Sequence, residues 1–391
     1  MTRRIDALDV LRGVAIMGTL GTNIWIFTAA DGPAEFLQLG GSTGVVETFL
    51  RFMSNGKFLG LLTLLFGVGL ELQYRSAVRR GLRWPGRYLW RATLLFAEGA
   101  LHYVLVFEFD VLMGYAITSM IVAYLVGRSR RAVTAWMVTA GALHVTMVAL
   151  VTAALMVGPA GGGALAYPQD SWLDQVAFRL RYIPVFRAEL VFIIPMGIVL
   201  FLLGARLLRA GVFEEHGAGL RRKLIVIGLG VGVPLNLATS FAGPAWFAVD
   251  RYLLAPLVAL GLLGLITSIV LGMRGAPGVL RKGITNVGRT ALSCYVFQNL
   301  AAGVLCYGWG LGLAGRLDGL RPWWVTVVWA GICVLFVVLS SLWLRRFSRG
   351  PLELAWQWAY QAPGRGTAPV TAEGEEARLV TGGRSDGRGA L

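Results

Sequence analysis

Apolar runs of membrane length alternate with short polar loops along almost the whole chain. A helix of roughly 20 apolar residues crosses the hydrocarbon core of a bilayer. The runs lie at about residues 10–29, 57–73, 89–107, 111–127, 132–158, 190–208, 223–242, 252–273, 290–313 and 323–344. The pattern therefore predicts an all-α fold, a polytopic membrane helix bundle of about ten transmembrane helices over residues 1–360.

The basic residues are distributed unequally between alternate loops. One set of alternate loops, together with the N-terminus and the segment after the last run, holds 22 Lys and Arg residues, and the other set holds 8. The positive-inside rule assigns the richer set to the cytoplasm. Both termini are therefore expected in the cytoplasm, in a multi-pass protein of the cell (plasma) membrane. Residues 361–391 are Gly-, Arg- and Thr-rich without apolar periodicity, which predicts a disordered cytoplasmic tail.

The external segment 159–189 is the longest predicted connection between spans. It opens with a Gly-rich turn, and then apolar residues recur at helical spacing over residues 171–183. Ser171 and Asp174 form a capping pair at the start of this stretch, and Pro184 is expected to end it. An amphipathic helix lying on the outer membrane face is the predicted structure. Its apolar positions are Trp172, Val176, Leu180 and Ile183.

Composition supports the membrane assignment and narrows the class of partner. Charged residues make up 15% of the chain, against about 25% in soluble domains, and the mean hydropathy is +0.66. The net charge of +15 would suggest nucleic acid in a soluble protein, but these cations lie mainly in loops. We therefore expect the lipid bilayer as partner and no nucleic acid. The three cysteines all lie in apolar runs and predict neither a disulfide framework nor a metal site.

One apolar segment, Leu89–Met113, carries five ionisable residues: Arg91, Glu98, His102, Glu108 and Asp110. On a helix, Arg91, Glu98 and His102 lie within about 40° of one another, and Asp110 lies about 80° round from His102 and two turns above it. Ionisable groups inside a membrane are costly unless they pair or line a wet cavity, so they indicate a functional site. The alternative is that Arg91 snorkels to an interface and His102 is a hydrogen-bonded packing residue.

Polar residues in other runs extend the candidate site. In the first run Asp9, Arg12 and Asn23 share one helical face, and we expect them to face the second or third span in the bundle interior. Snorkelling of Asp9 and Arg12, and helix–helix hydrogen bonding by Asn23, are the alternatives. Further candidates are Lys57 at the external mouth of the second span and the mid-membrane amides of the ninth, Gln298 and Asn299. His144 stands alone among apolar residues and is expected to be structural.

Five stretches together resemble the YeiB-like family of bacterial membrane proteins, known as domain of unknown function four-one-eight. The family's LDxLRGxA start falls on Leu8–Ala15, and its Lys-Phe opening on Lys57 and Phe58. Its Gly-x-x-His followed by Asp falls on Gly99, His102 and Asp110, with Phe109 where the family has Gly. The stretches are RIDALDVLRGVAIMGTLGTN, KFLGLLTLLFGVGLELQYRSA, RATLLFAEGALHYVLVFEFDVLMGYAI, VGRTALSCYVFQNLAAGVLCYGWGLGLAGRL and SLWLRRFSRGPLELAWQWAY.

The first-span pattern is in turn similar to that of a wider group of membrane acyltransferases. This resemblance implies transfer of an acyl group from cytoplasmic acyl-CoA, the expected co-substrate, to a small-molecule or lipid-linked acceptor at or beyond the membrane. His102 would act as general base, with Glu98 or Asp110 orienting its imidazole. No bound cofactor or metal is expected, and a homo-oligomer is left open. The expected substrate-binding residues are Asp9, Arg12, Asn23, Lys57, Arg91 and Gln298.

Two other functions use the same residues differently. In a proton-coupled transporter of a small molecule, Glu98, His102 and Asp110 would form a proton relay. The sequence shows no inverted repeat of the kind common in such transporters. In a non-catalytic membrane scaffold or sensor, the amphipathic segment 171–183 would be the contact surface.

Overall fold

The computed structural model describes residues 5–33, 44–158, 165–273 and 275–362, which form helices and no strand. The expected tail and Gly-rich turn fall largely on residues 363–391 and 159–164, outside the described residues. Two helical stretches contain π-helical turns, η2 (Val226–Gly232) and η4 (Asp250–Leu254). The α-helices are α1 (Asp6–Phe27), α3 (Val45–Ser54), α4 (Lys57–Arg79), α5 (Arg87–Leu105), α6 (Leu112–Leu125), α7 (Arg130–Val157), α8 (Trp172–Arg181), α9 (Ile183–Arg187), α10 (Leu190–Arg209), α11 (Ala218–Ile225), α12 (Val233–Phe241), α13 (Phe247–Val249), α14 (Ala255–Gly272), α15 (Val279–Arg289), α16 (Ala291–Cys306), α17 (Leu313–Arg316), α18 (Trp323–Arg346) and α19 (Pro351–Gln361).

The expected all-α membrane fold is confirmed at the level of class. Seven helical stretches of the described chain are long and apolar enough to cross a membrane. Two further apolar helices, α6 and α16, are shorter, and α5 carries the charged residues noted above. Each of the ten apolar runs is mostly helical, although the run 290–313 leaves the helix after Cys306. The chain is therefore a helical membrane protein.

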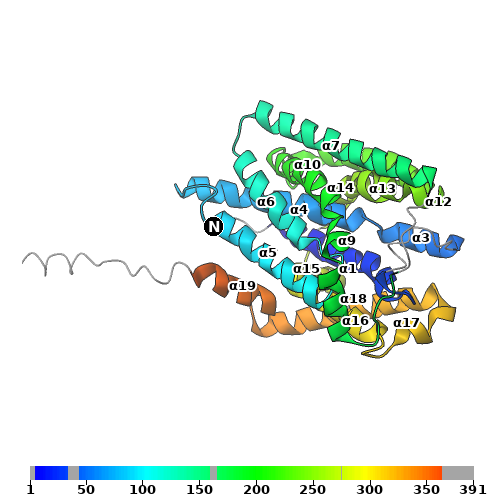
Figure 1. The fold of residues 1–391 in the computed structure, drawn as a ribbon. Coiled ribbons are helices and arrows are strands. Elements are labelled where there is room, and N and C mark those ends of the chain that lie inside the picture. Colours follow the sequence, from blue (N-terminus) through cyan, green and yellow to red (C-terminus); the bar gives the residue numbers. More distant parts are fainter. Residues whose placement is uncertain (1–4, 34–43, 159–164, 274, 363–391) are drawn as a thin grey trace, which may run out of the picture.

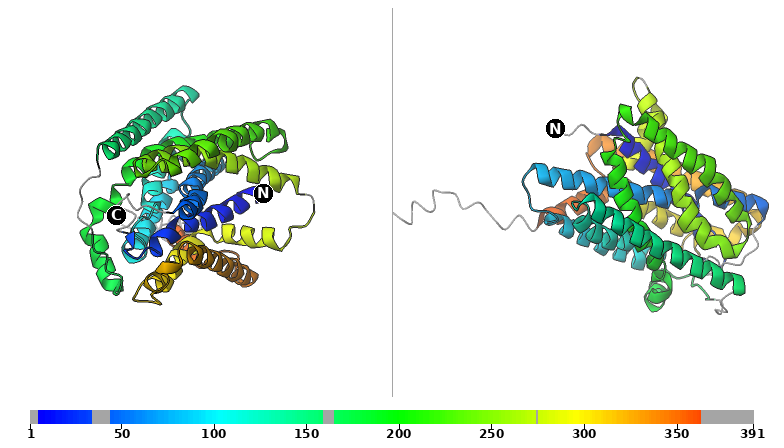
Figure 2. Two further views of the ribbon diagram at one scale, coloured as in Figure 1. Left: turned by 90° about the vertical axis from the view of Figure 1, so that its right-hand side faces the viewer. Right: turned by 90° about the horizontal axis from the view of Figure 1, so that it is seen from above.

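The helices differ in how deeply they lie in the bundle (Figures 1 and 2). α1 and α4 occupy its centre, whereas α7 and α18 lie at its periphery. In the most apolar window of α1, 78% of the residues are buried, compared with 22% in α7 and 22% in α18. Apolar side chains on the outer helices therefore face outward, as expected where lipid replaces water around the protein.

Two ends of the bundle can be defined by what α5 contacts. At its first residue, Arg87 donates to the carbonyl of Tyr360 in α19, at 2.9 Å, and the two helices lie side by side (Figure 1). At its last residue, the carbonyl of Leu105 accepts from the Trp172 indole of α8, also at 2.9 Å. We refer to these as the α19 end and the α8 end. The candidate site lies along α5 between them.

Glycines allow α1 and α15 to pack backbone against backbone. A Cβ atom at Gly288 of α15 would lie 1.8 Å from the Asp9 carbonyl oxygen, and one at Gly13 of α1 would lie 2.1 Å from the Ile284 carbonyl oxygen. Close approach through small residues is a main source of helix association in membranes. The position of the α1 polar face therefore depends on these two glycines.

Substitution Gly288→Ala is expected to destabilise the protein by about 1–3 kcal/mol or more, because overpacking a filled contact forces backbone shifts. The measurement is the thermal unfolding midpoint of the detergent-purified chain. Gly69→Ala is the matched control, since a Cβ atom at this helical glycine meets nothing within 4 Å. An equal effect of the two substitutions would contradict the proposed close contact.

The amphipathic segment forms α8, as predicted, with Ser171 Oγ accepting from the Asp174 amide at 3.2 Å. The expected end at Pro184 is wrong, because α8 stops at Arg181 and Pro184 lies in the first turn of α9, where proline is favoured. Gln175 and Arg179 face the bundle and are buried, whereas Leu173 and Leu180 are exposed. The buried positions of this helix are thus polar, and two of its leucines face outward.

Candidate functional site

His102 and Asp110 form a buried pair, with Nδ1 of His102 2.7 Å from Oδ2 of Asp110. Their side chains are 1% and 0% exposed. The sequence pattern placed Asp110 two turns above His102, but α5 ends at Leu105 and the chain reverses before α6. Gly99 makes room for this reversal, because a Cβ atom there would lie 2.7 Å from the Met113 amide nitrogen. The Gly-x-x-His pattern is thus a packing requirement of the α5–α6 hairpin.

The Asp110 carboxylate is held by several further groups. Its Oδ1 accepts from the backbone amides of Leu112, at 2.9 Å, and Met113, at 3.4 Å, in the first turn of α6. The Tyr295 hydroxyl donates to its Oδ2 at 3.4 Å. Free amides at a helix N-terminus favour a negative group in this position. Asp110 therefore presents a fixed acceptor to the imidazole.

A chain of hydrogen bonds continues from His102 to α1. The Asn299 side-chain amide nitrogen lies 3.4 Å from Nε2 of His102, and Oδ1 of Asn299 accepts from the Asn23 amide at 3.1 Å. All of these side chains are buried. Asn23 thus faces the bundle interior, as expected, but its partner belongs to α16 rather than to the second or third span. We call Asn23, Asn299, His102 and Asp110 the polar chain.

The two ring nitrogens of His102 have different hydrogen-bond partners, which favour one tautomer. A carboxylate only accepts, so Nδ1 carries the proton that is donated to Asp110. The Asn299 amide group donates to the other nitrogen, so Nε2 holds a lone pair. A histidine oriented by a carboxylate through Nδ1, with Nε2 as acceptor, has the geometry of a general base. The bond to Asn299 is long, so an acceptor hydroxyl that approaches Nε2 more closely can compete with it.

No hydrogen bond joins Glu98 to His102 in the described part of the chain. Its Oε2 atom is buried and has no hydrogen-bond partner among the described residues. The carboxylates of Asp110 and of Glu353 in α19 both lie within its electrostatic range. Glu353 itself accepts from the Leu292 amide at 2.9 Å. Carboxylates therefore lie at intervals from α19 to His102.

Basic and aromatic side chains gather at the α19 end. The Arg91 guanidinium lies 4.6 Å from the Trp356 ring centroid and within electrostatic range of Arg12 and Arg349. Arg12 forms an ion pair with the buried Asp9 at 3.3 Å. Guanidinium groups beside aromatic rings suit both phosphates and a flat heteroaromatic ring. The structure thus brings Asp9, Arg12 and Arg91 to one end of the site.

Lys57 and Gln298 lie apart from the polar chain in the described structure. Gln298 donates to the Ile16 carbonyl at 3.2 Å and so joins α16 to α1. Lys57 is buried, donates to the Phe52 carbonyl and lies over the Phe52 ring, in electrostatic range of Asp250. His144 is structural, as expected, since its Nε2 contacts the Tyr252 carbonyl at 2.9 Å.

The α8 end holds a second buried ion pair, which sequence reasoning missed. The Arg179 guanidinium of α8 donates to Glu108 at 2.7 Å, and both side chains are buried. Burial disfavours the charged form of Arg179, yet the Glu108 carboxylate holds the pKa of Arg179 above its usual value. Tyr167 also donates to Glu108, and burial and this carboxylate raise the pKa of the phenol. The sequence indicated Glu108 as an acidic residue in an apolar segment, but its partner Arg179 lies 71 residues away in the chain.

Arginines from two segments hold the loop that carries Asp110. Arg179 donates to the carbonyls of Val104, at 3.0 Å, and Val106, at 3.3 Å. Arg187 donates to the Asp110 carbonyl at 2.9 Å and to the Glu108 carbonyl. These bonds satisfy carbonyls that have no helical partner where α5 ends. The position of Asp110 beside His102 is thus reinforced from the α8 side.

Comparisons with known proteins confirm the resemblance to the YeiB-like family. Residues 207–362 match the family model described as "Protein of unknown function (DUF418)". The chain is 25% identical to the uncharacterised protein YxaH of Bacillus subtilis, over 91% of this chain and 94% of YxaH. It is 28% identical to the uncharacterised protein YeiB of Escherichia coli, over 90% of this chain and 94% of YeiB. No solved structure matches the chain.

Proposed function

We propose that this membrane protein, similar to YeiB and YxaH along nine tenths of its length, is an acyltransferase of the plasma membrane. It would move an acyl group from cytoplasmic acyl-CoA to a hydroxyl or amine acceptor at or beyond the membrane. The observation that supports this most is the buried His102–Asp110 pair, which leaves Nε2 of His102 as a hydrogen-bond acceptor.

The reaction can be written with these groups in defined roles. The acceptor O–H or N–H gives its proton to Nε2 of His102 as its oxygen or nitrogen attacks the thioester carbonyl. The Asp110 carboxylate orients the ring and stabilises the imidazolium that forms. The C–S bond then breaks, and the CoA thiolate leaves and takes up the proton that Nε2 of His102 holds. The acceptor gains the acyl group, and free CoA is the second product.

The α19 end is proposed to receive the acyl donor. The phosphopantetheine and nucleotide of acyl-CoA carry phosphates. Arg91 offers a guanidinium group over the Trp356 ring, and Arg12 and Arg349 lie within electrostatic range of Arg91. Arg12 and Arg91 were singled out by the sequence as binding residues, whereas Trp356 was not. Asp9 would then act indirectly, by fixing Arg12 through their ion pair. Asn23 would act through Asn299 on His102.

The proposal requires ten membrane spans with both termini in the cytoplasm, so that the α19 end faces the cytoplasm and the α8 end faces outward. Cysteines introduced at the exposed positions Asp174 and Glu215 are expected to label from opposite sides. A membrane-impermeant maleimide on intact cells should label residue 174, and residue 215 only after permeabilisation. The parent chain is the control, since Cys294 and Cys306 are buried and Cys333 partly so. The reverse result would invert every side assignment.

Binding of CoA is the direct test of the donor site. Titration calorimetry with CoA and acetyl-CoA on the detergent-purified full chain should give binding below about 1 mM, the usual range for enzyme substrates. Arg91→Ala and Arg12→Ala should each weaken it about tenfold or more, as expected for a charged hydrogen bond. Arg128→Ala is the matched control, because Arg128 is an exposed arginine at another loop of the same side. Absence of binding by the folded protein would exclude the acyltransferase, and full binding by Arg12→Ala and Arg91→Ala would exclude this donor site.

A proton-coupled transporter of a small molecule is the second candidate function, and one observation favours it. Glu98 presents an unpartnered carboxylate oxygen between Glu353 and the polar chain, as a proton relay requires. This function predicts no CoA binding and, in reconstituted vesicles, a proton flux that His102→Ala abolishes. If neither CoA binding nor proton flux is found, a scaffold or sensor remains.

A further inference from the structure

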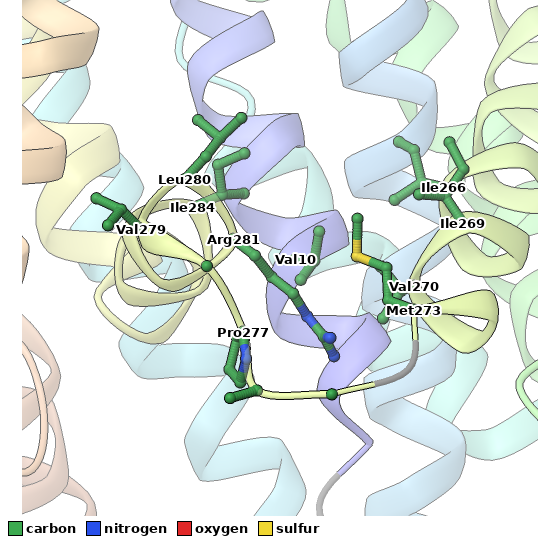
Figure 3. Close-up of a pocket in the computed structure, with 13 residues that line it drawn as sticks. Val10, Ile266, Ile269, Val270, Met273, Pro277, Val279, Leu280, Arg281 and Ile284 are labelled. Carbon is green, nitrogen blue, oxygen red and sulfur yellow. The ribbon is translucent and has the colours of Figure 1, made fainter.

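A pocket of about 520 Å³ lies between α14 and α15 and is separate from the polar chain (Figure 3). Both helices pack against α1, and Val10 of α1 forms part of the pocket lining. Arg12 interacts with Arg91 and lies about 200° from Val10 on a helix, so the pocket opens away from the proposed donor site. Its volume lies within the range of small-molecule sites, about 300–1,000 Å³.

The walls of the pocket are apolar and continue onto the outer surface. Ile266, Ile269 and Val270 line it from α14, and Leu280 and Ile284 line it from α15. Ile269 and Leu280 are 48% and 77% exposed. In a membrane-spanning protein such surface faces lipid rather than water. A hollow in it therefore suits a hydrocarbon chain.

One positively charged side chain, Arg281, lies among these apolar walls. The Arg281 side chain extends between α15 and α14 (Figure 3), and it is 17% exposed. Within the described parts of the chain, its guanidinium has a single recorded anionic neighbour, Asp6, at 3.9 Å. Asp6 is itself 72% exposed, so solvent weakens this pair. A mostly buried guanidinium next to a hydrocarbon slot is complementary to a phosphate attached to an acyl chain.

We infer that this pocket binds one anionic phospholipid of the cytoplasmic leaflet, with an acyl chain in the apolar slot and its phosphate on Arg281. The proposed orientation places the start of α15 at the cytoplasmic surface, where basic pockets between helices bind anionic headgroups. Lys282 adds a second positive charge nearby but does not line the pocket. The inference rests on that orientation and not on acyl transfer.

The test uses the full chain in detergent with dioleoyl phosphatidylglycerol and dioleoyl phosphatidylcholine as probes. Native mass spectrometry should retain one phosphatidylglycerol on the wild-type chain, and this lipid should raise the thermal midpoint saturably, whereas phosphatidylcholine should not. Arg281→Gln should weaken phosphatidylglycerol binding about tenfold or more. Ile269→Trp, at a half-exposed wall position, should fill the slot and have the same effect if Arg281→Gln fails to fold.

Lys282→Gln is the matched control, because it removes the same charge from the adjacent, exposed position. An equal loss of phosphatidylglycerol binding with Lys282→Gln would mean that the lipid is attracted by the positive charge of the whole region, and it would overturn the proposed site. Equal retention of phosphatidylcholine would overturn the role of Arg281. Displacement of phosphatidylglycerol by palmitoyl-CoA would assign the pocket to the acyl donor and overturn the lipid inference. None of these outcomes depends on whether His102 is catalytic.

Discussion

Replacing His102 by alanine is expected to reduce acyl transfer by ~10²–10⁴-fold, the range that a general base contributes. CoA binding should be unchanged, because the guanidinium groups proposed to bind it lie at the other end of α5. Measuring both quantities on one purified sample separates loss of chemistry from loss of fold. A base that acts only in the chemical step lowers kcat more than it changes KM.

His144→Ala is the matched control for this prediction. Both histidines are buried in helices, but His144 contacts a backbone carbonyl and, among the residues that the structure describes, has no recorded bond to a carboxylate. Its replacement should reduce stability without changing kcat per folded molecule. Asp110→Asn should lower kcat as well, because an amide can donate to Nδ1 and move the histidine proton to Nε2. Full acyl transfer in the folded His102→Ala protein would remove His102 from the mechanism.

Replacing Arg179 by alanine is expected to lower the free energy of unfolding by about 3–5 kcal/mol, because the change leaves the Glu108 carboxylate buried without its cation. Glu108 is fully buried, and one of its oxygens already lacks a hydrogen-bond partner among the described residues. The carbonyls of Val104 and Val106 would lose their donor at the same time. Thermal unfolding of the purified chain measures the loss.

Arg181→Ala provides the comparison on the same helix. Arg181 is exposed and contacts the Tyr182 ring, so its removal should change stability by less than about 0.5 kcal/mol. The double substitution of Glu108→Gln with Arg179→Ala should cost less than the sum of the single changes, since no buried charge is then left alone. Additive effects would show that the two side chains do not interact.

Hydropathy and charge were sufficient to predict the fold class and to select the segment on which the candidate site is built. Each apolar run became helical, and the ionisable stripe of Leu89–Met113 led directly to His102. What the sequence pattern could not supply was the point at which α5 ends. A continuous helix puts Asp110 two turns beyond His102, whereas the reversal at residues 106–111 brings the two side chains to 2.7 Å. That reversal depends on Gly99 and on two arginines from later parts of the chain, Arg179 and Arg187.

The apolar periodicity also could not predict hydrogen-bond partners that lie far apart in the sequence. Asn299 lies 197 residues from His102 in the sequence, and Gln298, its neighbour, has an equally polar side chain. Only the orientation of α16 decides that Asn299 joins the polar chain while Gln298 bonds to the α1 backbone. In α8, the apolar spacing predicted an amphipathic helix correctly. It did not indicate that two polar residues, Gln175 and Arg179, would be the buried ones.

The Glu108–Arg179 pair also bears on the order in which the protein assembles during synthesis. Domains fold from the N-terminus as the chain emerges, and Glu108 is made 71 residues before Arg179. Until α8 has been synthesised and has packed in place, the α5–α6 hairpin carries the acidic Glu108 side chain and unpaired carbonyls at its tip. We therefore expect this hairpin to reach its final position only after the segment through Arg187 has been translocated. Chains truncated before residue 179 should be degraded faster than chains truncated after residue 190.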